Sequence, residues 1–157
     1  MAQFNIPVVT KIWDKDYEAV IKITGQYNAS QNASNTLILQ ANTLKGANSS
    51  QLCMVDVNHI DFATSISNGF ISIEFISANT SNIENSTVFT VGKRNCGELA
   101  CVNFNPLGAN ATGDINLYTS ALDANDSFTL IMYCRKSVSN TPSAWSNVEN
   151  QPPNTYY

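Results

Sequence analysis

The sequence predicts an all-β protein, an antiparallel β-sandwich that is jelly-roll-like and has seven to eight strands. Several short segments alternate apolar and polar residues, as in strands whose one face is buried and whose other face meets water. Clusters of Asn, Ser, Gly and Asp separate these segments and favour turns. No segment shows a sustained 3.6-residue period, so little helix is expected.

The alternation predicts a series of strands along the chain. In the first one, residues 17–25, Ala19, Ile21 and Ile23 share a face with Tyr17, and Glu18, Lys22 and Thr24 lie opposite. Further strands are expected at residues 37–41, 52–62, 69–78, 87–92 and, as a short element, 100–104. Turn signals between residues 62 and 69 predict that the third and fourth strands are separate.

Residues 113–137 form the most regular stretch and predict a hairpin. A strand with alternating Ile115 and Leu117 precedes a small, polar turn at residues 120–126. The second strand, residues 128–134, is almost entirely apolar. Such a strand is typical of the middle of a sheet, where both faces are covered, so we expect it there.

The length of 157 residues corresponds to one domain with flanking segments. Residues 1–13 are expected to form an N-terminal arm or an edge strand, and residues 14–137 the β-sandwich. Residues 138–157 lack periodicity and carry three of the five prolines, which predicts an extended C-terminal tail.

Both ends carry aromatic side chains outside the patterned domain, which suggests anchors for a partner. We expect these residues to contact neighbouring subunits: Phe4, Trp13, Trp145, Tyr156 and Tyr157. A passive end with incidental aromatic residues is the alternative for the tail.

The composition narrows the classes of partner. Hydrophobic residues make up 43% and charged residues 13%, and the formal net charge is -4. Without a basic run the chain is not expected to bind nucleic acid. No apolar run approaches the roughly 20 residues of a membrane span, and residues 1–13 lack the pattern of an export signal. We therefore expect neither a membrane partner nor export.

No group of residues predicts catalysis. His59 is the one histidine, and no nucleophile or phosphate-binding motif accompanies it. His59 is therefore interpreted as an imidazole at the core edge or surface, and the protein as neither an enzyme nor a cofactor protein. Asp14, Asp16 and Glu18 are interpreted as solvated, and Asp123–Ser127 as a turn, with a weak calcium site as its alternative.

The four cysteines do not predict a metal site. Cys53 and Cys134 lie in apolar strand patterns and are expected to be buried thiols. Only Cys96 and Cys101 are close in sequence, whereas structural zinc sites generally use two close pairs. A disulfide between Cys96 and Cys101 remains open, and no metal is expected.

The segments AVIKITG (residues 19–25) and GDINLYTSALDANDSFTLIMYCRK (residues 113–136) resemble the two ends of a group of small virion proteins of tailed bacteriophages, the marine phage type. The resemblance covers about residues 14–136, and its two ends carry it. It implies a jelly-roll-like sandwich without a catalytic motif. It also implies a structural role, as a head decoration (cement) protein or as a neck, tail or fibre component.

On this resemblance the expected function is to bind the major capsid protein and stabilise the head, in a virion assembled in the host cytoplasm. Self-association, for example as a trimer, is expected with it. Two hypotheses from other classes stay open. A carbohydrate-binding β-sandwich would show exposed aromatic residues on one face, and an enzyme on a jelly-roll scaffold would need several histidines.

Overall fold

The computed structural model describes residues 4–15, 18–44, 52–77, 86–99 and 111–139. These residues contain one short 3₁₀ turn, η1 (Ala41–Thr43), and no α-helix. The strands, in chain order, are β1 (Val8–Asp14), β2 (Glu18–Gln26), β3 (Ser34–Leu39), β4 (Leu52–Ser77), β5 (Ser86–Leu99), β6 (Ala111–Thr119) and β7 (Ser127–Ser139). The prediction of an all-β protein is confirmed. The described part of the chain offers no helix with the length and apolar character of a membrane span.

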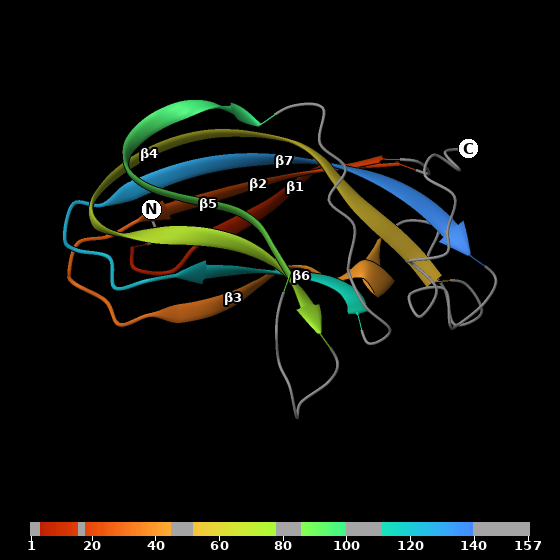
Figure 1. The fold of residues 1–157 in the computed structure, drawn as a ribbon, viewed down its shortest axis with the longest axis horizontal. Helices are drawn as coiled ribbons and strands as arrows, with labels where there is room; N and C mark the ends of the chain where they lie inside the picture. Colours follow the sequence, from red (N-terminus) through yellow and green to blue (C-terminus); the bar gives the residue numbers. More distant parts are fainter. Residues whose placement is uncertain (1–3, 16–17, 45–51, 78–85, 100–110, 140–157) are drawn as a thin grey trace.

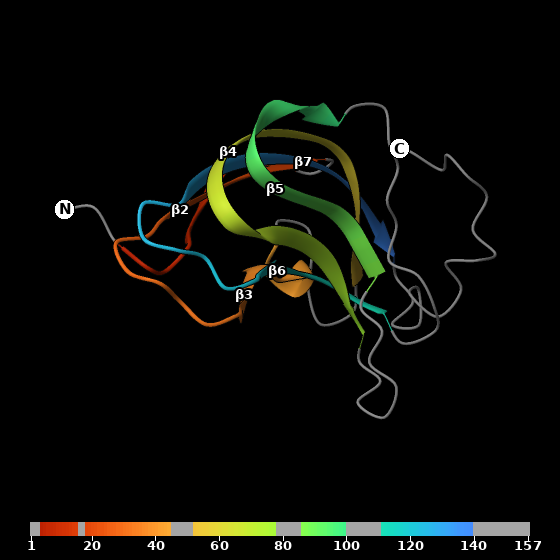
Figure 2. The same cartoon turned by 60° about the vertical axis from the view of Figure 1, so that its left-hand side comes forward.

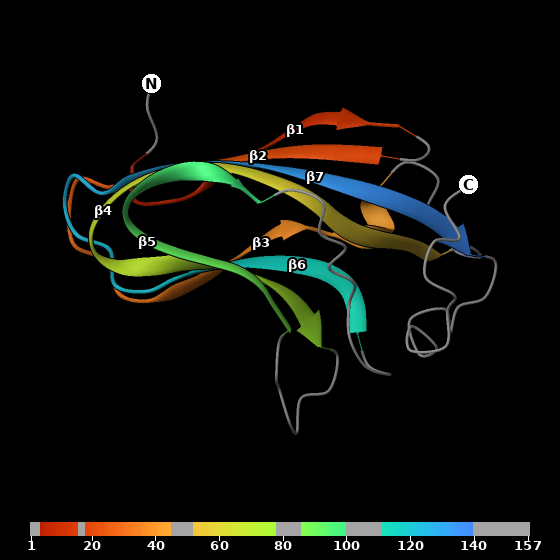
Figure 3. The ribbon, with the colours of Figure 1, turned by 45° about the horizontal axis from the view of Figure 1, so that its top comes forward.

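The seven strands form one antiparallel sheet that folds over itself into two layers. The strand order is β1-β2-β7-β4-β6-β3, and β5 pairs with β4. The first half of β4 pairs with β7, and its second half pairs with β6. Figure 3 shows β1, β2 and β7 in one layer and β3 and β6 in the other, with β4 and β5 passing between them. This arrangement is the expected sandwich, closed on one side by a bent pair of strands.

The core lies between the two layers and follows the predicted alternation. Ala19, Ile21 and Ile23 of β2 are at most 2% exposed, and Glu18 and Lys22 face solvent. The opposite layer contributes, among others, Ile71, Ile73, Phe75, Ile115 and Leu117, each also at most 2% exposed. Burial of each such side chain stabilises the fold by roughly 1.5–3 kcal/mol, which makes the two facing apolar surfaces the main source of stability.

The prediction of separate strands at residues 52–62 and 69–78 is wrong, because β4 runs through both without a break. Its pairing with β5 shifts between Ser65 and Phe70, where the strand passes from one layer to the other. Figures 1 and 2 show how β4 and β5 curve together through this bend. Gly69 has a φ of +83°, and a Cβ there would lie 2.5 Å from the Ser120 Oγ. The turn-forming residues therefore bend a strand here instead of ending one.

The predicted hairpin of residues 113–137 is also wrong in its pairing. Both strands exist, as β6 and β7, but β4 lies between them in the sheet order. The connection at residues 120–126 crosses from one layer to the other. A sequence pattern can show two strands and a short connection, but not whether a distant strand inserts between them.

Asp126 fixes this crossing. Its side chain is 2% exposed, and its carboxylate accepts hydrogen bonds from the Ser67 backbone N–H (2.8 Å), the Ser67 hydroxyl (2.7 Å) and the Asp123 N–H (2.8 Å). The Ser120 hydroxyl in turn accepts from the Phe70 N–H at 2.7 Å. One buried carboxylate therefore joins the bend of β4 to the connection between β6 and β7.

β7 occupies the expected central place, between β2 and β4. Phe128, Leu130, Met132 and Cys134 face the core, but Tyr133 on the outer face is 37% exposed. The apolar run was expected to be covered on both faces, but its outer face is open to solvent at Tyr133. β7 ends at Ser139, which pairs with Leu52, so the strand extends two residues beyond the expected domain end. The strand predicted at residues 100–104 lies outside the described residues.

Candidate functional site

The exposed apolar side chains gather at the N-terminal edge of the sandwich. Among the described residues, eight large hydrophobic side chains are exposed, and five of them belong to residues 4–13. These five, called the edge patch below, are Phe4 (42%), Ile6 (54%), Val9 (37%), Ile12 (53%) and Trp13 (42%). The three outside the patch are Leu37, Phe70 and Tyr133.

The position of β1 explains why the edge patch is exposed. Among the strands that the structure describes, β1 is the last of its layer and pairs with β2 alone. Val9 lies opposite Ile23, which is fully buried, yet Val9 is 37% exposed. The second layer therefore does not cover β1 as it covers β2, and Figure 3 shows β1 at the free margin. Side chains on both faces of β1 are left open to solvent.

Charged and polar contacts hold the two ends of this segment in place. At the C-terminal end, Asp14 forms ion pairs with Lys11 (3.0 Å) and with Lys136, whose side chain is fully buried. At the N-terminal end, the Asn5 side chain donates to Asn28 Oδ1 at 2.7 Å and accepts from the Asn28 N–H at 3.0 Å. The edge patch is therefore presented on a fixed backbone.

Trp13 carries its own charged neighbour. The Lys15 ammonium lies 3.8 Å from the centroid of the indole ring, a cation–π contact. Of the predicted partner contacts, Phe4 and Trp13 are both exposed, whereas Trp145, Tyr156 and Tyr157 lie outside the described residues. The contact of any of them with a neighbouring subunit stays a prediction.

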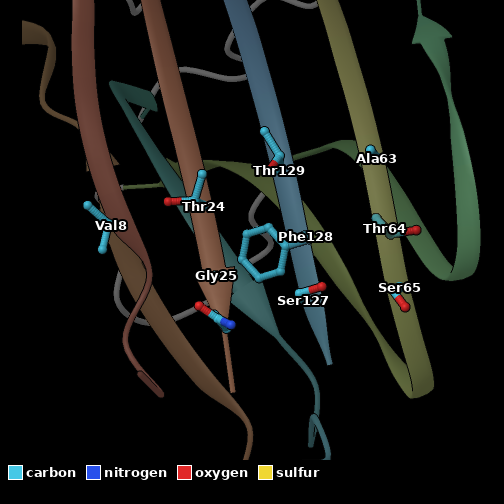
Figure 4. Close-up of a pocket in the computed structure, with 10 residues that line it drawn as sticks. Val8, Thr24, Gly25, Ala63, Thr64, Ser65, Ser127, Phe128 and Thr129 are labelled. Atoms are coloured by element: carbon cyan, nitrogen blue, oxygen red, sulfur yellow. The ribbon is translucent and has the colours of Figure 1, made fainter. Parts of the chain in front are cut away.

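A hollow of about 680 Å³ opens beside the start of β1. Figure 4 shows its lining on four neighbouring strands, with hydroxyl groups from Thr24, Ser65, Ser127 and Thr129. Phe128 lies across Gly25, where a Cβ would come within 2.4 Å of the ring. None of the lining residues that the structure describes carries a charge, or a nucleophile with a base beside it, so the described lining combines neutral hydrogen-bonding groups with apolar side chains.

A cluster of titratable side chains lies on the outer face of the sheet, where β4 runs between β5 and β7. His59 Nε2 is 2.7 Å from Asp61 Oδ1 and 3.7 Å from Glu98 Oε2. The Tyr133 ring meets the His59 ring edge-on, with 5.1 Å between centroids. Partial burial and the Asp61 carboxylate raise the pKa of Tyr133. His59 is 25% exposed by side chain, which agrees with the predicted place at the core edge or surface.

The sequence analysis missed this grouping. His59 and Asp61 are two residues apart on one strand and therefore share a face. This part of the group could have been found from the spacing in the sequence. Glu98 comes from β5, whose path beyond residue 92 had not been predicted. The group could therefore not be assembled from the sequence pattern.

The acidic residues considered for calcium are engaged in structural contacts. Asp14 pairs with the two lysines, and Asp16 lies outside the described residues. Asp126 is enclosed by its hydrogen bonds, and Asp123 accepts from the Ser30 hydroxyl at 3.1 Å. Among the described residues, no third His, Cys, Asp or Glu converges with Asp123 and Asp126, and the calcium alternative at this turn stays open.

Two of the four cysteines can be placed by side chain. Cys134 is 2% exposed, which confirms the predicted buried thiol. Cys96 is exposed on β5 and forms no disulfide with another residue that the structure describes. The Cys53 side chain and Cys101 lie outside what the structure describes, so the proposed Cys96–Cys101 bridge stays open.

No model of a known protein family matches the chain, and no curated protein matches it significantly.

Proposed function

We propose that the protein is a structural component of a bacteriophage virion, in the first place a decoration or cement protein that binds the major capsid protein and stabilises the head. A neck, tail or fibre component is the alternative in the same class. The observation that carries the proposal is the edge patch, on β1 and the residues just before it. The resemblance of residues 14–136 to small virion proteins supplies the virion context.

The physical argument concerns the cost of leaving the edge patch in water. Large exposed hydrophobic groups are unexceptional when scattered, but a gathering at one margin is typical of an interaction surface. Trp and other aromatic anchors contribute about 2 kcal/mol or more each when they are buried as hot spots at a partner. A charge-poor surface suits such packing, because fewer ions lose their hydration.

The experiment compares two edges of the same sandwich. Ile12→Lys places a charge in the edge patch, and Leu37→Lys places one on β3, where Leu37 is 48% exposed. Both variants are expected to fold, since neither side chain is in the core. Ile12→Lys is expected to lower occupancy on purified particles at least tenfold, measured by quantitative mass spectrometry, and Leu37→Lys to leave it near the parent level.

Three results would contradict the proposal. The first is equal occupancy of both variants. The second is absence of the protein from purified particles. The third is saturable binding to a glycan array through the hydroxyl-lined hollow, which would favour the carbohydrate-binding alternative.

A further inference from the structure

The geometry points to a divalent transition-metal site on the outer face of the sandwich, formed by His59, Asp61 and Glu98, with zinc as the ion it fits best. This inference is independent of the proposed function. It rests on how two strands, β4 and β5, place one imidazole and two carboxylates beside one another.

The strand register brings the three ligands together. Ile60 is fully buried, so His59 and Asp61 on either side of it point away from the core. Asp61 lies directly opposite Glu98 in the pairing of β4 with β5. One ligand atom from each of the three residues lies within 4.8 Å of the other two.

The register also places two like charges face to face. Directly opposed carboxylates on neighbouring strands repel each other and destabilise a sheet. A cation between Asp61 and Glu98 removes that repulsion, and the His59 nitrogen already lies next to both carboxylates. The opposed pair is thus a second feature, separate from the ligand count, that favours a bound cation.

The donor set selects the kind of ion. Calcium and magnesium are bound by oxygen ligands, whereas an imidazole suits zinc and other transition metals. Zinc accepts nitrogen and carboxylate ligands at about 2.0–2.2 Å, which separates neighbouring ligand atoms by roughly 3.3–3.5 Å. The 3.7 Å between His59 and Glu98 is close to that spacing, and the 2.7 Å between His59 and Asp61 must widen by about 0.6–0.8 Å.

The surroundings allow this adjustment while holding the imidazole in place. Glu98 is 69% exposed and Asp61 41% exposed, so both carboxylates are free to turn. Tyr133, opposite His59 on β7, supports the ring edge-on and borders Asp61. Outer groups of this kind orient metal ligands and strengthen binding. Three protein ligands leave a coordination position open to water or to a neighbouring molecule.

The test uses the fact that His59 is the one histidine of the chain. Zn²⁺ alone is titrated into ¹⁵N-labelled protein carrying Cys96→Ala, which removes the nearby exposed thiol, and the imidazole nitrogen signals are followed. We expect a saturable shift that EDTA reverses. Asp61→Asn and Glu98→Gln are each expected to weaken the affinity at least tenfold, and Glu18→Gln on β2 to leave it unchanged.

Unfolding in the absence of metal provides a second readout. Glu98→Gln is expected to leave the metal-free protein as stable as the parent or more so, because it removes the like-charge pair, while losing the zinc-induced rise in melting temperature. The inference is overturned if the imidazole signals do not shift saturably below 1 mM Zn²⁺ (about the limit for a weak site). It is equally overturned if Glu98→Gln and Asp61→Asn bind with the parent affinity, since the imidazole would then act alone.

Discussion

Folding changes the protonation of the Asp56 carboxyl group. It lies on β4 opposite Arg135 of β7. Burial raises the pKa of Asp56 to about 6, although the Arg135 charge acts in the opposite direction. Desolvation disfavours the charged carboxylate more than this neighbour favours it.

This shift predicts a pH-dependent stability with a definite sign. The folded-state pKa of about 6 lies above the unfolded value of 3.8, so the folded state holds the proton more tightly between these values. The contribution is fully present below about pH 4 and is lost as the pH rises through 6. Asp56→Asn is expected to reduce this fall, measured by urea unfolding from pH 4 to 7. A slope unchanged from that of the parent would assign the effect elsewhere.

Gly69 is the residue that the bend of β4 requires. Its φ of +83° is strained for any other residue, and the Ser120 Oγ occupies the position of a Cβ. Gly69→Ala is therefore expected to lower the free energy of unfolding by about 1–3 kcal/mol. Gly97→Ala is the control, because a Cβ there would meet only the Phe62 ring, at 3.2 Å. Chemical denaturation measures both, and equal stability of the two variants would contradict the account.

At the scale of elements, the connection between β6 and β7 and the bend of β4 form one unit. Asp126 contributes its carboxylate to both, and the Tyr27 N–H donates to the Asp126 backbone carbonyl at 3.0 Å. Removal of the carboxylate would leave the Ser67 and Asp123 N–H groups without their acceptor. The bend of β4 and the connection between β6 and β7 then lose the contact that fixes where the sheet passes from one layer to the other.

Asp126→Ala is accordingly expected to cost about 3 kcal/mol of unfolding free energy, because it removes three hydrogen bonds to a charged carboxylate that is itself buried. Asp123→Ala is expected to cost less than about 1 kcal/mol, since the one donor to its carboxylate among the described residues is the exposed Ser30 hydroxyl. Thermal unfolding of both variants measures the difference. A loss in Asp123→Ala as large as that in Asp126→Ala would refute the assigned role.

The edge strand β1 exposes apolar side chains and also carries features that oppose pairing with a strand of another molecule. Its pairing with β2 is irregular between Lys11 and Trp13, and Lys11 places a charge on the strand. Irregularities and lysines on edge strands oppose indiscriminate strand pairing. The edge patch is therefore better suited to side-chain docking than to extension of the sheet.

At the scale of the whole molecule, we expect the sandwich to fold without residues 140–157. The strands and core side chains that the structure describes all lie between Phe4 and Ser139. A chain ending at Ser139 is expected to keep the cooperative unfolding and melting temperature of the full chain within a few degrees. If the aromatic residues of the tail dock on a partner, the same truncation lowers occupancy on particles.

The cut must fall after Ser139, because Val138 and Ser139 pair with Cys53 and Leu52. Circular dichroism and particle occupancy are measured on the same preparation. Failure of the truncated chain to fold would assign the tail to the core. Parent-level occupancy would restrict docking to the edge patch.

The sequence by itself determined the class of fold and the buried faces. Alternation identifies Ile21, Ile23, Ile71 and Ile73 as core residues, because a strand with one buried face must repeat every second residue. It also identified Phe4 and Trp13 as apolar residues outside the main pattern. The strand character of a segment and its buried face depend on neighbouring residues in the sequence, so the local periodicity is enough to predict them.

Only the tertiary structure decided how the strands are joined. β4 passes through both layers and separates β6 from β7, and β5 continues to Leu99 with Glu98 opposite Asp61. Pairing depends on backbone hydrogen bonds between distant segments, which leave no local signature in side-chain pattern. The same holds for the exposure of Val9, which follows from where the second layer ends. The group of His59, Asp61 and Glu98 likewise exists only because the register of two strands places it.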